Sequence, residues 1–185
     1  MQAEWEGRLR MWTDALARDF YEPLGRIDLE GFITTEMLDP SEAEARSFSP
    51  MPIGTVWGKT WEYCWMRGDF ALPEKARGQR IVMNLNQGGE ATLFVNGEAF
   101  GTRRAEWVKE KHHYYSDQVI TMDGVPGTAY HLLMEAYAGH DFPRNAQGRE
   151  TLGPMLEDDG NTYTLKPEDR LRQTVGECTF GIWHE

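Results

Sequence analysis

One alternating stretch limits the fold of this chain more than any other feature. Between residues 61 and 72, the two-residue period of a strand places Trp61, Tyr63 and Trp65 on one face. The opposite face carries a second set of apolar side chains, namely Cys64, Met66, Phe70 and Leu72. A strand that is apolar on both faces has to be covered on both sides. We therefore expect a second sheet on one side, and a helix, a loop or another domain on the other.

Most other segments have the pattern of short strands separated by turns. Apolar residues alternate over 81–85, 91–95 and 129–139, and further strands are predicted at 112–115, 161–165 and 173–183. Asn96-Gly97, between two alternating runs, is the typical signal of a type I′ hairpin. Within 129–139 one face is predicted to point inward, with Tyr130, Leu132, Met134 and Ala136. The other face then carries His131, Leu133, Glu135 and Tyr137.

One clear helical pattern lies at the N-terminus, over residues 4–20, and ends before Pro23. Its apolar stripe consists of Trp5, Leu9, Trp12, Leu16 and Phe20. Since no helices alternate with the strands, the sequence predicts an all-β fold, a two-sheet antiparallel jelly-roll sandwich with an N-terminal amphipathic helix. Residues 1–24 are predicted to form the helix and to pack on the sandwich, and residues 25–185 to form the sandwich itself.

Charge and cysteine content narrow the class of protein. The 185 residues carry 19 Lys and Arg against 30 Asp and Glu, a net charge of -11, with neither sign gathered in blocks. A nucleic-acid-binding surface needs a basic stripe, so we expect no nucleic acid partner. The sequence shows no secretion signal and no apolar run of about 20 residues, which predicts a cytoplasmic protein without membrane contact. Cys64 and Cys178 are expected to be reduced thiols in the core.

The sequence contains no recognisable catalytic or metal-binding motif. The five histidines form no H-E-x-x-H motif, and the chain has no C-x-x-C, no P-loop, no G-x-S-x-G and no G-x-G-x-x-G. A glycosidase needs two suitably placed acids, but among 30 acidic residues some pair is always near enough, so spacing decides nothing. We therefore assign no catalytic residue, no metal ligand and no cofactor to this chain.

Aromatic residues are the remaining candidates for a binding surface. Tryptophan rings stack on sugar faces, and they also cover sheets or dock neighbouring domains. The candidates for carbohydrate binding or domain docking are Trp57, Trp61, Trp65, Trp107 and Trp183.

Several motifs resemble a known family. They are Trp57-Gly58-x-x-Trp61, Trp65-x-Arg67-x-x-Phe70-x-Leu72-Pro73, Gly78-x-x-Ile81-x-x-Asn84-Leu85 and the strand from Glu90 to Gly97. Together they resemble the N-terminal β-sandwich domain of bacterial α-mannosidases of glycoside hydrolase family 38. The end of that strand, Val95-Asn96-Gly97, is shared more widely with galactose-binding-like jelly rolls.

The resemblance implies a non-catalytic domain of a larger enzyme. In that family, zinc and an aspartate nucleophile belong to a later catalytic domain that removes α-linked mannose. The His-x-Asp pairs that supply its zinc ligands do not occur here. The implied partner is therefore the catalytic domain of the same parent chain. The sequence stops at residue 185 directly after an apolar run, and we expect a piece of a longer chain.

Two alternatives stay open at this point. The chain could be a free-standing carbohydrate-binding module, or an accessory sandwich of another glycosidase such as a β-galactosidase. A homo-oligomeric contact through exposed aromatic rings is compatible with each of these interpretations.

Overall fold

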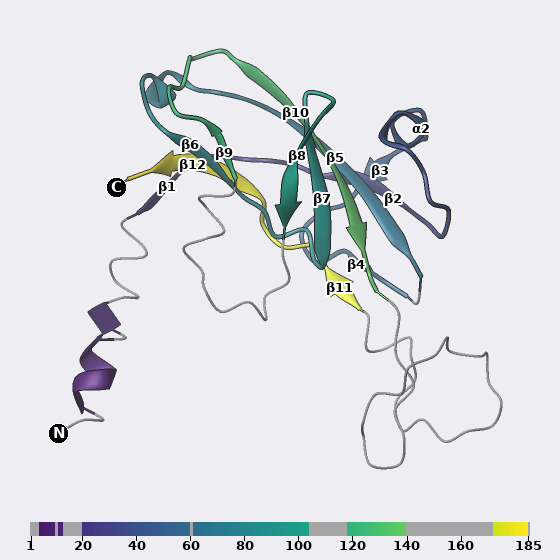
Figure 1. Cartoon of the computed structure of the whole chain (residues 1–185), viewed down its shortest axis with the longest axis horizontal. Helices are drawn as coiled ribbons and strands as arrows, with labels where there is room; N and C mark the ends of the chain where they lie inside the picture. The colour runs from purple at the N-terminus through teal and green to yellow at the C-terminus, as the bar shows by residue number, and fades with distance from the viewer. Residues whose placement is uncertain are drawn as a thin grey trace.

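The fold is a sandwich of two antiparallel sheets (Figure 1). A computed structural model describes residues 4–9, 11–12, 20–59, 61–103, 118–139 and 172–184. The four-stranded sheet has the order β1 (Tyr21–Arg26), β12 (Thr179–Trp183), β6 (Ile81–Asn84) and β9 (Val119–Thr121). The six-stranded sheet has the order β3 (Ser49–Pro50), β2 (Glu30–Thr34), β5 (Tyr63–Ala71), β10 (Ala129–Tyr137), β7 (Glu90–Val95) and β8 (Glu98–Arg103).

Three further short elements lie outside the two sheets, in addition to the helical residues at the N-terminus. A two-stranded ribbon pairs β4 (Val56–Trp57) with β11 (Gln173–Thr174). Helix α2 spans Pro40–Glu44, and a 3-10 turn, η1, spans Glu74–Ala76. Within the described helices, no segment has the length and apolar character needed to span a membrane. The predicted all-β sandwich is confirmed.

The main core lies between the two sheets and is organised around β5. Cys64, Met66 and Phe70 point from β5 into this core, where Phe70 stacks on Phe180 of the opposite sheet with 4.5 Å between ring centroids. β10 pairs with β5 along nine residues, from Ala129 opposite Ala71 to Tyr137 opposite Tyr63. The inward set predicted for this strand is confirmed, since Leu132, Met134 and Ala136 are fully buried in the same core and Tyr130 packs against it.

The outer face of β5 is covered by a second apolar cluster beneath α2. Trp65, Leu133 and Ala43 are buried there, and the partly buried side chains around them are Phe32, Leu38, Phe48 and Phe94. Helix α2 starts at this point because Asp39 and Glu42 form a capping box and Pro40 occupies the first turn. The expectation of cover on both sides is therefore confirmed, with α2 as the element on the outer side.

The N-terminal segment differs from the prediction. Residues 4–9 and 11–12 are helical, but Trp5, Leu9 and Trp12 of the predicted stripe are 60%, 65% and 69% exposed and do not pack on the sandwich. Phe20, the last residue of the stripe, does contact the sandwich through Trp183, and Leu16 lies outside the described residues. The sandwich also begins before residue 25, because β1 starts at Tyr21. Pro23 lies inside β1 rather than ending a helix. This is possible because β1 is an edge strand, whose outer side needs no ladder donor.

The predicted hairpin is confirmed in detail. β7 and β8 pair as neighbours, and Asn96 and Gly97 between them have φ values of 52° and 82°. Two positive φ values in succession are what a type I′ turn requires. The strand predicted over 173–183 is divided into β11 and β12, and the strands predicted at 112–115 and 161–165 lie outside the described residues.

The two cysteines should be inert in the folded protein. Both thiols are buried and unpaired with each other, and burial raises the pKa of Cys64 to about 12 and that of Cys178 to about 11. Because the thiolate is the reactive species, we expect almost no reaction with a disulfide reagent at about pH 8 until the chain is unfolded. Thiol titration with and without denaturant tests this. Rapid modification of the native protein, or a disulfide found without reductant, would contradict it.

Candidate functional site

The tryptophans selected from the sequence do not form one surface. Trp57 is 3% exposed, belongs to the main core and donates a hydrogen bond from Nε1 to the backbone oxygen of Gln87 at 3.2 Å. Trp65 is fully buried on the other side of the six-stranded sheet, beneath α2. Since neither ring has a face open to solvent, neither can stack on a sugar or a docking partner. The prediction is wrong for these two residues.

The other three candidates are placed differently. Trp183 is partly buried on β12, in the opposite sheet, where its ring stacks on Phe20 with 5.5 Å between centroids. Trp61 is 50% exposed and lies just before β5, with a φ of 65°. Trp107 lies outside the described residues. Among the described tryptophans, Trp61 is therefore the one that has an accessible ring beside the six-stranded sheet.

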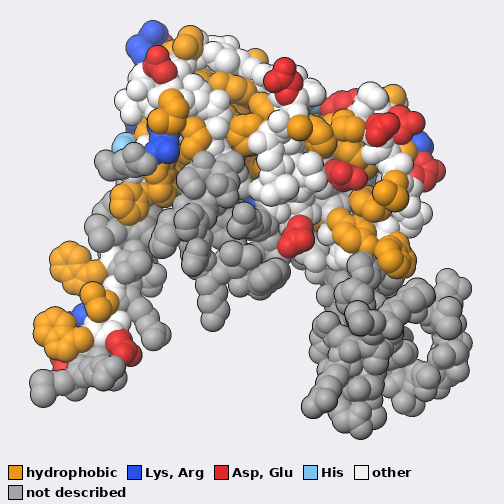
Figure 2. All heavy atoms as spheres, in the orientation of Figure 1, with side chains coloured by type: hydrophobic (Ala, Val, Ile, Leu, Met, Phe, Trp, Pro, Cys, Tyr) orange, Lys and Arg blue, Asp and Glu red, His pale blue; other side chains and the backbone are white. Residues whose placement is uncertain are grey.

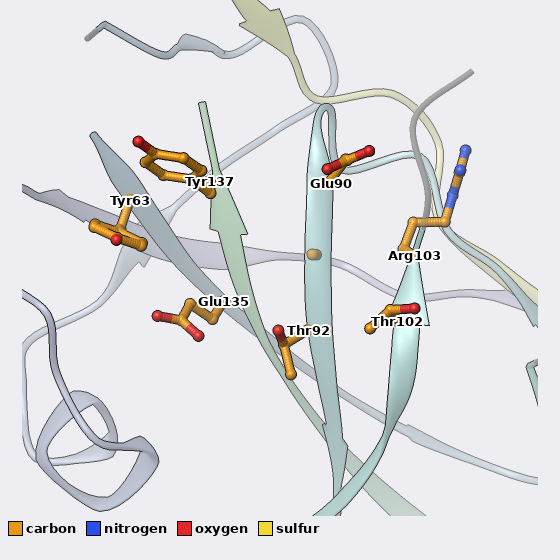
Figure 3. A pocket seen from close by; sticks show the side chains of 8 residues that line it. Tyr63, Glu90, Thr92, Thr102, Arg103, Glu135 and Tyr137 are labelled. Atoms are coloured by element: carbon orange, nitrogen blue, oxygen red, sulfur yellow. The ribbon is translucent and has the colours of Figure 1, made fainter. Parts of the chain in front are cut away.

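A pocket of about 470 Å³ lies on the outer face of the six-stranded sheet (Figure 3). Four neighbouring strands, β5, β10, β7 and β8, form its floor. Its lining consists of Tyr63, Glu90, Ala91, Thr92, Thr102, Arg103, Glu135 and Tyr137. The outer surface of this sheet is thus divided between an apolar part beneath α2 and a polar, aromatic hollow beside it.

Strand register brings the pocket side chains into two rows. In one row Tyr137 lies opposite Tyr63 on one side and Glu90 on the other. The two tyrosine rings stack with 4.8 Å between centroids and an interplanar angle of 29°. In the next row, a two-residue step along the strands, Glu135 lies opposite Thr92. Residues two apart on a strand share a face, so both rows open toward the same side.

The second row continues onto the edge strand. Thr92 lies opposite Thr102 of β8, and both side chains point to the outer face (Figure 3). Ala91 and Arg103 pair one position away, so they point to the other side of the sheet and contribute the rim. Arg103 donates from Nε to the backbone oxygen of Leu85 at 2.9 Å. The open face therefore presents carboxylates, hydroxyls and rings.

Glu135 is the most unusual group in this pocket. It is partly buried, and burial raises the pKa of its carboxyl group. The described part of the chain offers it no hydrogen bond and no ion pair. Thr92 and Thr102 also have no hydrogen-bond partner for their hydroxyl groups within the described ranges. Glu135 and Thr92 are partly buried, so leaving their polar atoms without partners is costly, whereas Thr102 is exposed and can bond water. A ligand with hydroxyl groups would satisfy Glu135 and Thr92.

A second polar group on the same sheet face has its partners within the protein. Arg67 donates from Nε to Glu30 at 2.6 Å and from Nη1 to Glu44 at 3.2 Å. Its guanidinium lies 4.0 Å from the centroid of the Phe48 ring. Figure 2 shows acidic side chains spread over the visible face, with several close together at the end that carries α2.

His131 extends this network between two carboxylates. Its Nδ1 lies 2.7 Å from Asp69 and its Nε2 lies 2.7 Å from Glu44 of α2. Partial burial lowers the pKa of His131, but the hydrogen bonds to Glu44 and Asp69 outweigh this effect, so the pKa is raised. The imidazolium and Arg67 together fix Glu44, and with it the last turn of α2, against the sheet. We assign this network a structural role.

Metal binding finds no support in the described part of the chain. Over these residues, no group of three or more His, Cys, Asp or Glu side chains is placed to hold a metal ion.

The comparisons with known proteins point to one class. A model described as the jelly-roll domain of α-mannosidase, of the Ams1-like type, matches residues 27–168. This match and the two-sheet sandwich define a jelly-roll domain of the α-mannosidase type. The chain belongs to the Ams1-like α-mannosidase jelly-roll family.

Similar proteins are much longer than this chain. Alpha-mannosidase 2C1 of Mus musculus is 33% identical over 72 residues, which are 39% of this chain and 7% of that protein. Alpha-mannosidase 2C1 of Homo sapiens is 36% identical over 70 residues, again 7% of its length. Among solved structures, a β-glucuronidase from Ruminococcus gnavus in complex with uronic deoxynojirimycin has 12% identity and a TM-score of 0.46, over 88% of this chain and 29% of that one.

Two tryptophan substitutions should differ in their effect on stability, because one ring is buried and the other is accessible. Trp65→Ala removes a fully buried ring from the cluster beneath α2 and should lower the free energy of unfolding by about 3 to 5 kcal/mol. Trp61→Ala, at a half-exposed position, should cost less than about 1 kcal/mol. Urea unfolding of both variants measures the difference. An equal loss of unfolding free energy in the two variants would contradict the burial of Trp65.

Replacement of His131 should give a pH-dependent change in stability. Its pKa is raised in the folded state, so the stabilisation is complete below the unfolded value and is lost as the pH rises through the folded value. His131→Gln should lower the free energy of unfolding by about 1 kcal/mol or less at about pH 6, since the side chain is about a third exposed. By about pH 9 the difference from the wild type should shrink.

Urea unfolding at the two pH values measures this difference. The exposed Glu98→Gln variant, on β8, serves as the control and should show no such trend. A His131→Gln difference that stays constant or grows with pH would contradict the role assigned to the imidazolium.

Proposed function

We propose that this chain is the non-catalytic N-terminal domain of an α-mannosidase, and that it packs on and supports the catalytic domain of the same polypeptide. The match of residues 27–168 to the α-mannosidase jelly-roll family carries this proposal. The chain spans only 7% of the length of the curated relatives that it matches, so most of such an enzyme lies outside the sequence described here. The parent enzyme would hydrolyse α-linked mannose from glycans.

The chemistry of that hydrolysis would belong to the rest of the parent. A zinc ion would be held by the catalytic domain, which would also supply the nucleophile. We also propose a cytoplasmic location, which the buried, unpaired thiols of Cys64 and Cys178 support, because such thiols are typical of reducing compartments.

The sandwich has properties suited to a supporting role. Its main core joins side chains of both sheets, and its second cluster closes part of the outer face, so the two layers form one packed body. A body of this kind can hold a neighbouring domain in a fixed orientation. The tryptophan surface predicted for that contact is not formed by Trp57 and Trp65, and the contact has to use other residues.

The 185-residue chain on its own should not hydrolyse an aryl α-mannoside. The expected result is no release of the aryl group and no stoichiometric zinc by elemental analysis, because neither zinc ligands nor a nucleophile domain is assigned to it. A commercial α-mannosidase serves as the positive control. Hydrolysis that a chelator abolishes would contradict the proposal.

The supporting role is tested in the parent enzyme. Sequencing beyond codon 185 should reveal a catalytic domain in the same reading frame. Deletion of residues 1–185 from that parent should lower its thermal midpoint and its activity, whereas zinc content per folded molecule should stay the same. If the truncated enzyme keeps the activity and the thermal midpoint of the full-length protein, the domain does not support catalysis.

A further inference from the structure

We propose that the pocket on the outer face of the six-stranded sheet binds a neutral saccharide, with one sugar ring against Tyr63 and Tyr137 and its hydroxyl groups on Glu135, Thr92 and Thr102. This inference is independent of the supporting role, because the pocket and its groups belong to this chain alone. Its volume of about 470 Å³ falls within the range of about 300 to 1,000 Å³ that is typical of small-molecule sites.

The two tyrosines supply an aromatic wall. Their rings stack on each other on adjacent strands, with 4.8 Å between centroids, and this contact fixes the orientation of both. Both phenol side chains line the hollow, and their rings offer an apolar surface to a ligand. The C–H groups on one side of a pyranose ring need such a surface, because its hydroxyl groups lie around the edge.

The polar row beside the rings matches the edge of a sugar. Glu135 offers acceptor oxygens that lack a donor in the described chain, and the hydroxyl groups of Thr92 and Thr102 can both donate and accept. A saccharide hydroxyl also does both, so a single ligand type can satisfy every group in the row. A hydrogen bond to an ionised carboxylate is stronger than one between neutral groups, which makes Glu135 the main polar contact.

Charge argues against anionic ligands. Glu135 and Glu90 both line the pocket. Among the described residues of the lining, the one cation is Arg103, which lies opposite the inward-facing Ala91 and donates to the backbone oxygen of Leu85. A phosphate or a uronic acid would place its charge close to these carboxylates and be repelled. The ligand is therefore neutral or cationic.

The extent of the site favours a saccharide over a cationic side chain. The contacts run across four adjacent strands, from Tyr63 on β5 to Thr102 on β8, which is roughly 14 Å at the usual strand spacing. An ammonium group is a compact charge and would use one end of this array. A mono- or disaccharide has hydroxyl groups along its length and would use all of it.

Saturation-transfer NMR and calorimetry on the 185-residue chain test the proposal. The probes are methyl α-mannopyranoside, methyl α-glucopyranoside and a mannobiose, with n-butylammonium as the cationic probe. We expect at least one saccharide to bind with a dissociation constant in the millimolar range. Tyr137→Ala should weaken this binding at least tenfold and Glu135→Gln about fivefold, whereas Tyr137→Phe should keep most of it.

Glu98→Gln is the matched control, an acid-to-amide change on β8 outside the pocket lining, and it should leave binding unchanged. Thermal unfolding checks that each variant is folded, and if Tyr137→Ala is not, Glu135→Gln decides. The proposal is overturned if no saccharide binds at about 20 mM. It is also overturned if binding is unaffected by the pocket variants, or if butylammonium alone binds in a Glu135-dependent way. None of these outcomes bears on the truncation test of the supporting role.

Discussion

The structure depends on the burial of both faces of β5. Its inward side chains join the two sheets, with Phe70 stacked on Phe180, and its outward Trp65 anchors the cluster beneath α2. Because β5 pairs with β2 on one side and with β10 on the other, this double burial also fixes the register of the neighbouring strands. A slip by one residue would exchange the two faces, which would move Arg67 into the main core.

The alternation of side chains predicted the faces of the strands but not the elements that cover them. Period-two patterns assigned Met66 and Leu132 to the inner side, and the Asn96-Gly97 pair predicted the hairpin, because both signals are local. The sequence pattern did not identify the helix that covers the outer face of β5. The stripe that contains Trp5 is strongly amphipathic, whereas α2 is only five residues long and owes its place to the cap at Asp39 and to contacts far apart in sequence.

The same limit explains the candidate site. Sequence alternation placed Glu135 and Tyr137 on the outer face, as it did for Tyr63, but it gave no reason to group them. Grouping requires the strand order β5-β10-β7-β8 and the pairing of Tyr137 with Tyr63, and neither can be derived from one sequence. Tryptophans were predicted to form the binding surface because their rings are large. Large rings contribute most when fully buried, and Trp57 and Trp65 are used in that way.

The position of Pro23 in an outer strand has a consequence for solubility. Outer strands expose backbone donors and acceptors to which another chain can add, and proline removes a donor. β1 contains Pro23, and β3, at one end of the larger sheet, is only two residues long and ends in Pro50. At the other end, β8 has six residues and no proline. β9, the other outer strand of the smaller sheet, has no proline but is only three residues long. Among the outer strands of the two described sheets, β8 is therefore where we expect the strand addition that leads to aggregation to begin.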